Sequence, residues 1–174
     1  MKKLLQKFVI TLTFFTMLNI AQNSHCEAET SQSIFFVKIL NYVKNISSLE
    51  IVNVGIVFDN NSESIASRDR IINALKSNGR IRLVAIPKNS PDNKIQLMNV
   101  LYLANGVSVE DISQKAKRFK ILTFSSNFED VNKGFASITV ILRNNTPKVI
   151  VNLNNSKQEG QNLSSQLLKL SEII

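Results

Sequence analysis

The residues of this chain whose types could support acid–base or ligand chemistry are mostly carboxylates. Asp59 and Glu63 follow the nearly continuous apolar run at positions 51–58, which predicts a strand that is covered on both faces. Open α/β sheets bind ligands at the carboxyl ends of their strands. The two acids, with Asn61 between them, are therefore a candidate small-molecule site.

Two further acidic pairs offer other chemistry. Glu129 and Asp130 are adjacent in a segment that reads as a loop or short helix, and they could bind a cation or act as the acid and base of a hydrolase. The alternative is that both are simply solvated. Glu110 and Asp111 fall in the first turn of a predicted helix, where they would complement the helix dipole, and Ser108 three residues before Asp111 predicts a capping box.

Other catalytic and cofactor chemistry is disfavoured because the required residues are missing. The only histidine is His25 and the only cysteine is Cys26, and both lie in a segment that we expect to be removed. A catalytic triad, a zinc site and a disulfide therefore lack their residues. The first strand-to-helix turn, at positions 59–64, holds no glycine, which argues against nucleotide binding. We expect no catalytic residue, no metal, no cofactor and no enzyme activity.

The amino terminus has the pattern of a bacterial secretory signal peptide. Three lysines stand within the first seven residues, and an apolar stretch follows at positions 8–21, which is too short to span a bilayer as a helix. Ala28 fits a cleavage site and Ala21 is a second candidate. A retained membrane anchor and a lipoprotein are the alternatives. We expect residues 1–28 to be the signal peptide and residues 29–174 to be a single periplasmic domain.

The charge of the chain does not indicate a nucleic-acid partner. The formal net charge is +8, and loss of three lysines and one glutamate with the signal peptide leaves +6. The lysines are spread along the sequence rather than clustered. A mild attraction to an anionic membrane or an acidic partner is allowed, and an AT-rich genome would give the same composition.

The order of apolar segments predicts an α/β fold. Strands and helices alternate through most of the chain, which predicts a three-layer structure with a mostly parallel sheet and helices on both faces. Runs at 135–142 and 147–153 predict a C-terminal antiparallel hairpin, followed by a helix. The apolar residues of that last helix recur at helical spacing: Leu163, Leu167, Leu170 and Ile174.

The first predicted helix of the domain, at positions 30–45, has an unusually broad apolar face. Packing in the core is the simpler use of this face. The alternative is a helix that binds a partner protein, and Phe35, Phe36 and Tyr42 are then the candidate contacts.

Several motifs together resemble the YfiR/HmsC-like family of periplasmic regulatory proteins. The helix Phe35-Phe-Val-Lys-Ile-Leu-Asn-Tyr-Val43 and the strand Val54-Gly-Ile-Val-Phe58 follow the expected signal peptide. The chain closes with Val149-Ile-Val-Asn-Leu153 and Gly160-Gln-Asn-Leu-Ser-Ser-Gln-Leu-Leu-Lys-Leu170. The resemblance covers nearly the whole expected mature chain. The residues Asn152, Gly160, Ser164 and Ser165 within the closing motif are interpreted as scaffold.

The resemblance implies a small, non-enzymatic α/β regulator that is often dimeric. The best-known member holds an inner-membrane diguanylate cyclase inactive by binding its periplasmic sensor region, and its release raises cyclic di-GMP and promotes biofilm formation. The resemblance thus implies an inner-membrane partner and a possible homodimer. A periplasmic small-molecule binding or sensor module is the alternative function. Met98 stands where many members have a cysteine, so redox control does not transfer to this chain.

Overall fold

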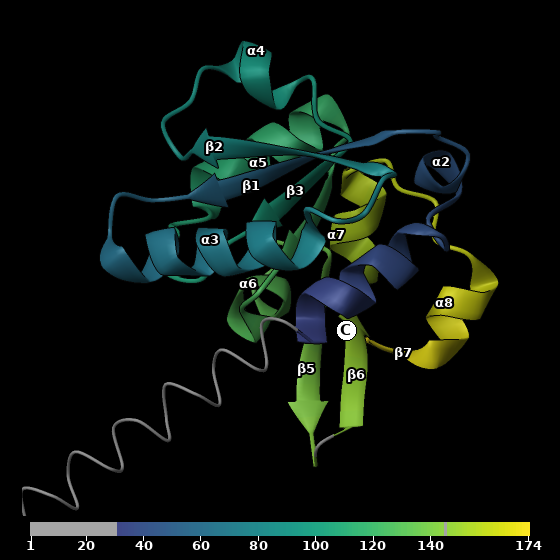
Figure 1. The fold of residues 1–174 in the computed structure, drawn as a ribbon. Helices are drawn as coiled ribbons and strands as arrows, with labels where there is room; N and C mark the ends of the chain where they lie inside the picture. The colour runs from purple at the N-terminus through teal and green to yellow at the C-terminus, as the bar shows by residue number, and fades with distance from the viewer. Residues whose placement is uncertain (1–30, 145) are drawn as a thin grey trace, which may run out of the picture.

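A seven-stranded sheet organises the part of the chain that the computed structural model describes, residues 31–144 and 146–174 (Figure 1). The expected signal peptide, residues 1–28, lies outside the described residues. The strand order is β2-β1-β3-β4-β5-β6-β7, and every neighbouring pair is parallel except the antiparallel hairpin of β5 and β6. The expected α/β fold with a mostly parallel sheet, a hairpin and a following helix is confirmed.

The bounds of the elements follow the predicted order closely. The strands are β1 (Val52–Phe58), β2 (Ile81–Pro87), β3 (Val100–Leu103), β4 (Leu122–Ser125), β5 (Ile138–Arg143), β6 (Thr146–Val151) and β7 (Ser171–Ile173). The helices are residues 31–40, α2 (Lys44–Ser47), α3 (Ser62–Leu75), α4 (Asp92–Ile95), α5 (Glu110–Phe119), α6 (Phe128–Asn132), α7 (Leu153–Gln158) and α8 (Ser165–Leu170).

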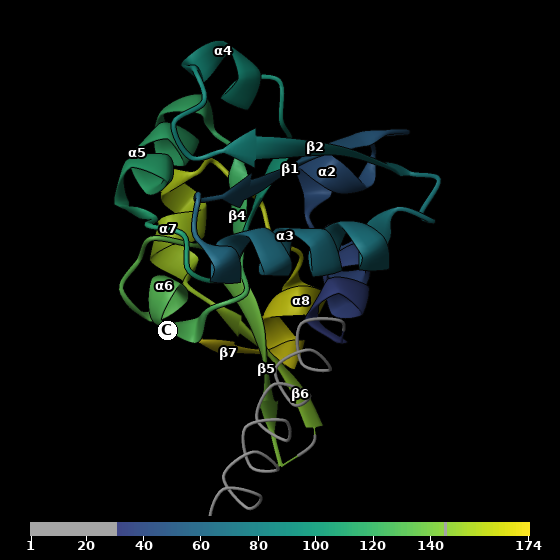
Figure 2. The same ribbon diagram turned by 60° about the vertical axis from the view of Figure 1, so that its left-hand side comes forward.

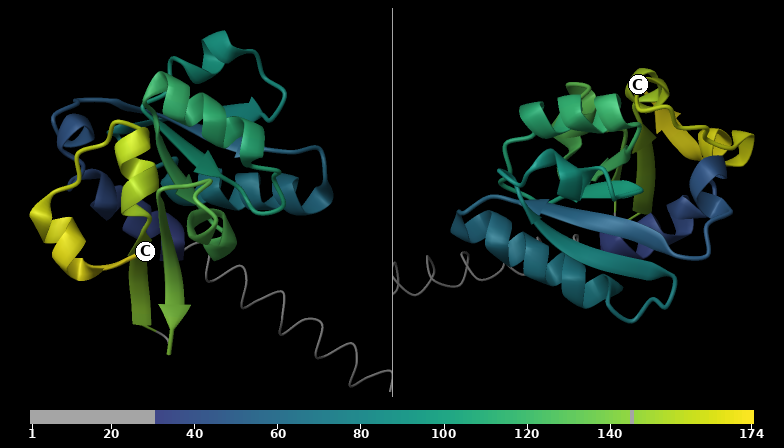
Figure 3. Two further views of the ribbon diagram at one scale, coloured as in Figure 1. Left: turned by 180° about the vertical axis from the view of Figure 1, so that it is seen from behind. Right: turned by 90° about the horizontal axis from the view of Figure 1, so that it is seen from above.

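Two hydrophobic cores lie on opposite faces of the sheet, because successive strand side chains point to opposite sides. Helix 31–40 and α3 cover one face, and α5, α6 and α7 cover the other (Figures 2 and 3). The central strands β3 and β4 are buried along their whole length. This burial explains why their sequences are continuous apolar runs rather than alternating ones.

The C-terminal helix ends earlier than its apolar spacing predicted. A break at Gly160, which has a φ of +69°, separates α7 from α8. Helix α8 then stops at Leu170, and the next residues form β7, which pairs in parallel with β6. The hydroxyl of Ser171 donates to the carbonyl of Leu167 at 2.7 Å. Because backbone pairing with β6 replaces the last helical turn, Ile174 is not a helical residue. Leu163 is not helical either, since it precedes α8 and forms an isolated bridge with Val43. The prediction that both lie on the helix is therefore wrong.

The predicted capping box before α5 is also wrong. The N-cap residue is Val109, and it makes no side-chain cap. The hydroxyl of Ser108 instead donates to the carboxylate of Glu110 at 3.2 Å. Four helices do have an N-cap side chain that accepts from a backbone N–H group: Asn61 for α3, Asn127 for α6, Asn152 for α7 and Ser164 for α8.

Candidate partner-binding surface

Helix 31–40 is fixed to the sheet by an aromatic cluster. The ring of Phe36 meets Tyr102 and Phe124 edge-on, at centroid distances of 5.0 and 5.1 Å. All three side chains are fully buried. Such edge-to-face pairs are each worth about 0.5–1.5 kcal/mol beyond their burial. Phe36 is therefore an anchor of the helix, and only Phe35 and Tyr42 of the three predicted contact residues reach the surface.

The turn after this helix is held by the segment between α7 and α8, residues 160–164, which we call the strap. The backbone N–H of Ser164 donates to the carbonyl of Tyr42 at 2.8 Å, and that of Lys44 donates to the carbonyl of Asn162 at 2.9 Å. The side chain of Asn45 donates to Gln161 at 2.9 Å. The strap thus fixes the position of α8 beside helix 31–40.

An apolar groove lies where helix 31–40, β6 and α8 meet. Figure 1 shows these three elements near one another in the lower part of the view. Its volume is about 410 Å³. Its lining residues are Phe35, Lys38, Ile39, Asn41, Tyr42, Pro147, Val149, Leu167 and Leu170. Leu170 is 66% exposed, so much of the apolar wall faces solvent. We refer to this feature as the groove.

The apolar surface continues beyond the groove itself. Ile34 is 53% exposed and lies on the same helix face as Lys38, because residues four apart share a face. Ile173 and Ile174, which follow α8 directly, are also exposed. Exposed apolar surface of this kind is typical of protein interaction sites.

The single charged residue in the groove lining is a lysine. The ammonium of Lys38 lies 5.2 Å from the centre of the Phe35 ring. An attraction between a cation and a ring face is worth about 0.5–1 kcal/mol at an exposed site. The groove therefore presents an apolar floor with one positive charge at its edge, which suits an apolar segment that carries an acidic residue.

The predicted ligand residues Asp59, Asn61 and Glu63 do lie together at the carboxyl edge of β1, but they hold local structure. The side-chain oxygen of Asn61 accepts from the N–H of Ser64 at 2.8 Å, and its amide donates to the carbonyl of Gly106 at 2.8 Å. Gly106, with a φ of +71°, packs so closely that a Cβ there would lie 3.1 Å from the Asn61 oxygen and 3.2 Å from Glu63. The loop after β3, which contains Gly106, thus fills the crevice between the carboxyl ends of β1 and β3, where the strand order reverses.

A polar hollow of about 620 Å³ lies beside this filled crevice. It is lined by Lys88 and Asn89, and by one face of α5: Asp111, Gln114, Lys115 and Arg118. Asp92 spans its rim and pairs with Lys115 at 3.0 Å and with Arg118 at 2.6 Å. The hydrogen bond from Lys115, together with the two positive charges, lowers the pKa of Asp92. The signal available in the sequence was the helical spacing of these four polar residues in α5.

The acids Glu129 and Asp130 lie at the start of α6. The hydroxyl of Ser125 donates to the carboxylate of Asp130 at 2.5 Å, and burial raises the pKa of that carboxyl while this hydrogen bond opposes the rise. The carbonyl of Asp130 accepts from the N–H groups of Phe135 and Ala136 at 2.8 and 3.0 Å. Asp130 therefore braces the turn into β5, whereas Glu129 is exposed.

A buried carboxylate that we did not predict lies between α7 and the sheet. Glu159 is 0% exposed. Its oxygens accept from the hydroxyl of Thr123 at 2.5 Å, the hydroxyl of Ser137 at 2.5 Å, the N–H of Thr123 at 3.0 Å and the amide of Asn155 at 2.8 Å. Burial raises the pKa of Glu159 to about 7, although these hydrogen bonds pull it down. The signal available in the sequence was a serine and a threonine in otherwise apolar strands.

Two further features concern the ranges 31–144 and 146–174, namely metal sites and membrane-spanning helices. Within these ranges, no three histidine, cysteine or acidic side chains gather as a metal site would require. Within the same ranges, no helix has the length and apolar composition needed to cross a bilayer.

The described residues form an α/β domain with an exposed apolar groove between helix 31–40, β6 and α8. A profile of the YfiR/HmsC-like family matches residues 31–172, and the chain belongs to this family. The membership supports a periplasmic regulator as the general class. No curated protein matches the sequence at a significant level.

Two solved structures share the fold. One is the ABC domain in complex with L-Trp from Streptococcus pneumoniae, at 10% identity and a TM-score of 0.60, which aligns with 84% of this chain and 62% of its own. The other is a ligand-free, open substrate-binding protein with adhesive properties from Clostridium difficile, at 13% identity and a TM-score of 0.56, which aligns with 75% of this chain and 57% of its own. The chain thus spans about three-fifths of these proteins, and the likeness at such identities shows the fold alone.

Proposed function

We propose that this chain is a non-enzymatic periplasmic regulator that represses an inner-membrane diguanylate cyclase by binding its periplasmic region. The observation that carries the proposal is the groove between helix 31–40, β6 and α8. Membership in the YfiR/HmsC-like family supplies the class of partner. Phe35 and Tyr42, two of the contacts expected from sequence, line the groove.

The groove suits a protein partner better than a small ligand. It is open along one side, and its most exposed wall residue is Leu170. Burying a leucine side chain of this kind contributes about 1.5–3 kcal/mol. A partner segment that inserts apolar residues between Phe35 and Leu170, and places an acidic group near Lys38, would bury the surface that the free protein leaves in water. A second copy of this chain is the competing occupant.

The experiment is complementation of a strain from which the gene has been deleted. Deletion should raise intracellular cyclic di-GMP, and the wild-type gene should restore the basal level. Leu170→Glu places a charge in the groove and should fail to restore it. An unchanged level in the deletion strain would overturn the proposal.

Leu97→Glu is the matched control. Leu97 is 68% exposed, as open as Leu170, but it follows α4 at the opposite end of the molecule (Figure 1). This variant should restore repression fully. Equal failure of both variants would point to a general effect of an added surface charge, and not to the groove.

A small-molecule sensor is the second candidate function, and the polar hollow beside α5 is the observation that favours it. The hollow is wide, at about 620 Å³, and carries three cationic side chains. Its cations are already engaged by Asp92 and Asp59. Thermal unfolding of the purified protein against a panel of anionic metabolites would reveal such a ligand as a rise in Tm.

A further inference from the structure

The polar cluster around Glu159 is the one place where the described interior departs most from an apolar core. Its four hydrogen-bond donors come from β4, from the start of β5 and from α7 itself, and all are uncharged groups. A buried carboxylate normally has a charged partner, since burial of an unpaired charge is costly. The hydrogen bonds lower this cost without removing it.

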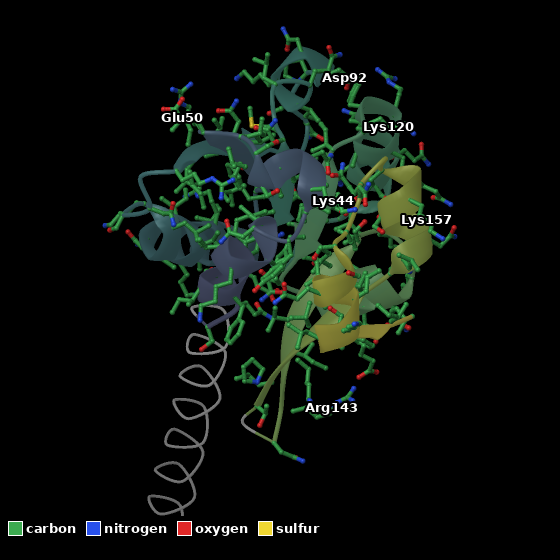
Figure 4. All side chains as sticks on the ribbon, turned by 90° about the vertical axis from the view of Figure 1, so that its right-hand side faces the viewer. Lys44, Glu50, Asp92, Lys120, Arg143 and Lys157 are labelled. Carbon is green, nitrogen blue, oxygen red and sulfur yellow. The ribbon has the colours of Figure 1, made fainter. Side chains whose placement is uncertain are left out.

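The charged groups on the surrounding elements either bond to partners other than Glu159 or face solvent. Lys120 at the end of α5 donates to the carbonyl of Gln158 at 2.9 Å, and Lys117 of α5 donates to the carbonyl of Gly134 at 3.1 Å. Asp130 of α6 is bonded to Ser125. Lys133 beside α6 is exposed, and so is Lys157 on α7, in the outer layer of the molecule (Figure 4). The charge on Glu159 therefore depends mainly on burial and on its uncharged donors.

Glu159 is also connected to the groove through the strap, which begins at the next residue. The side chain of Gln161 donates to the carbonyls of Glu159 and Lys120 at 2.8 and 3.0 Å, and it accepts from Asn45 at 2.9 Å. At the far end of the strap, Ser164 is bonded to Tyr42 and caps α8. Any loosening of α7 on the sheet is thus transmitted to both walls of the groove.

We propose that proton binding at Glu159 controls how firmly α7 and the strap pack against the sheet. The groove therefore responds to pH near neutrality. This proposal rests on the function proposed above. The neutral acid is easier to bury than the carboxylate. The packing of α7 and the strap on the sheet should therefore be firmer at acidic pH and looser at alkaline pH. Histidine usually serves as a switch in this range. The expected mature chain has none, since the only histidine is His25.

The first test needs no partner. Amide NMR signals of Gln161, Ser164 and Tyr42 are followed in the mature protein from about pH 5.5 to 8.5, a range that spans the ordinary values of a terminal amine and of a shifted carboxyl. We expect a common midpoint near 7, the value to which burial raises the pKa of Glu159. Glu159→Gln should abolish the transition. Persistence of the same midpoint in this variant, or flat signals in the wild type, would overturn the proposal.

Ser137→Ala provides a second variant in case Glu159→Gln does not fold. It removes one donor to the carboxylate but leaves the titrating group in place. Because that hydrogen bond favours the charged form, its loss should move the midpoint to higher pH. A role of Glu159 that is only structural would leave the midpoint unmoved. Glu50→Gln, at an exposed position, is the control and should behave as the wild type.

The second test measures the affinity for the purified periplasmic region of a diguanylate cyclase from the same genome. Binding should be roughly fivefold tighter at acidic than at alkaline pH, the lower end of common coupling between sites. Glu159→Gln should remove this difference. If the protein binds the cyclase equally well at every pH and the NMR signals of the strap do not titrate, the proposed pH response is wrong and the proposed function stands. A strap that titrates in a protein that binds no cyclase contradicts the proposed function instead.

Discussion

The groove and the Glu159 cluster reverse the usual distribution of side chains in opposite ways. In the groove, apolar residues such as Leu170 face solvent, whereas at Glu159 a carboxylate is fully buried. Exposed apolar patches and buried charges are informative exceptions in a folded protein. Apolar side chains inside and charged side chains outside are expected and need no explanation. The two sites lie at opposite ends of one short segment, the strap.

The two sites differ in what lowers their free-energy cost, which is the burial of a carboxylate at Glu159 and the exposure of apolar surface in the groove. The buried carboxylate has four hydrogen-bond donors within the protein, which lower the cost of its burial from inside the fold. Leu170 in the groove, by contrast, is left largely exposed by the described residues, and a bound partner would cover it. This contrast favours an internal, regulatory role for the cluster and an external, binding role for the groove.

The largest expected effect is the pH dependence of stability that arises from Glu159. Its pKa is raised from 4.5 in the unfolded chain to about 7 in the fold. A raised pKa means that stability is highest below the unfolded value and falls as pH rises through the folded value, by up to about 3 kcal/mol. Urea unfolding at pH values from below 4.5 to above 7 measures this fall, because the contribution is lost between the unfolded and the folded pKa.

Glu159→Gln is the variant that isolates this effect. Its free energy of unfolding should be lower overall, because an amide presents one oxygen where the carboxylate accepts with two. It should also change less between acidic and alkaline pH than the wild type does. An identical pH slope in both proteins would assign the slope to other carboxyl groups.

The second effect, in order of size, concerns the groove. Leu170→Glu should weaken binding of the cyclase periplasmic region by about 30-fold or more, since removal of a central contact costs on the order of 2 kcal/mol. Calorimetry gives the affinity. The free energy of unfolding should barely change, because Leu170 is 66% exposed in the free protein. Equal losses of affinity and stability would mean that the groove had not been tested separately.

The third effect tests whether the carboxyl edge of β1 is scaffold. Asn61→Ala removes the N-cap of α3 and the bond to Gly106, and the free energy of unfolding should fall by about 1–2 kcal/mol. Affinity for the partner should be unchanged, because this edge lies away from the groove. A loss of partner or metabolite binding without a loss of stability would restore the ligand site predicted from sequence.

The smallest effect concerns the charge at the edge of the groove. Lys38→Glu reverses the single charge in its lining. Affinity should fall only a few-fold, since exposed charge pairs contribute about 0.2–1 kcal/mol, and the loss should shrink at high salt. Lys76→Glu, on the exposed end of α3, serves as the comparison. A gain in affinity on reversal would show that the partner presents a basic surface.

The fold was predictable from sequence because its strands are apolar runs that alternate with amphipathic helices. Strand β1 and the hairpin of β5 and β6 were expected near their observed positions. The predicted last helix runs too far. Ile174 falls at helical spacing, although in the structure it follows strand β7. Apolar spacing cannot show that pairing with β6 competes with the final helical turn.

The candidate sites were less predictable because they depend on contacts between distant residues. Phe36 and Phe35 are adjacent in sequence and equally apolar, yet only the packing of Phe36 against Tyr102 and Phe124 shows which one faces inward. Glu159 reads as one more acid on a polar helix. Its burial follows from Thr123 and Ser137, which are 36 and 22 residues away in the chain.

Site-specific photocrosslinking in living cells tests the central claim most directly. A photoreactive amino acid is placed at Leu170 in the groove, or at Leu97 as the equally exposed control, and the crosslinked species are identified by mass spectrometry. The account predicts a covalent product with a membrane diguanylate cyclase from position 170 and none from position 97. A product from position 97 only, or a product from position 170 that contains only a second copy of this chain, would contradict it.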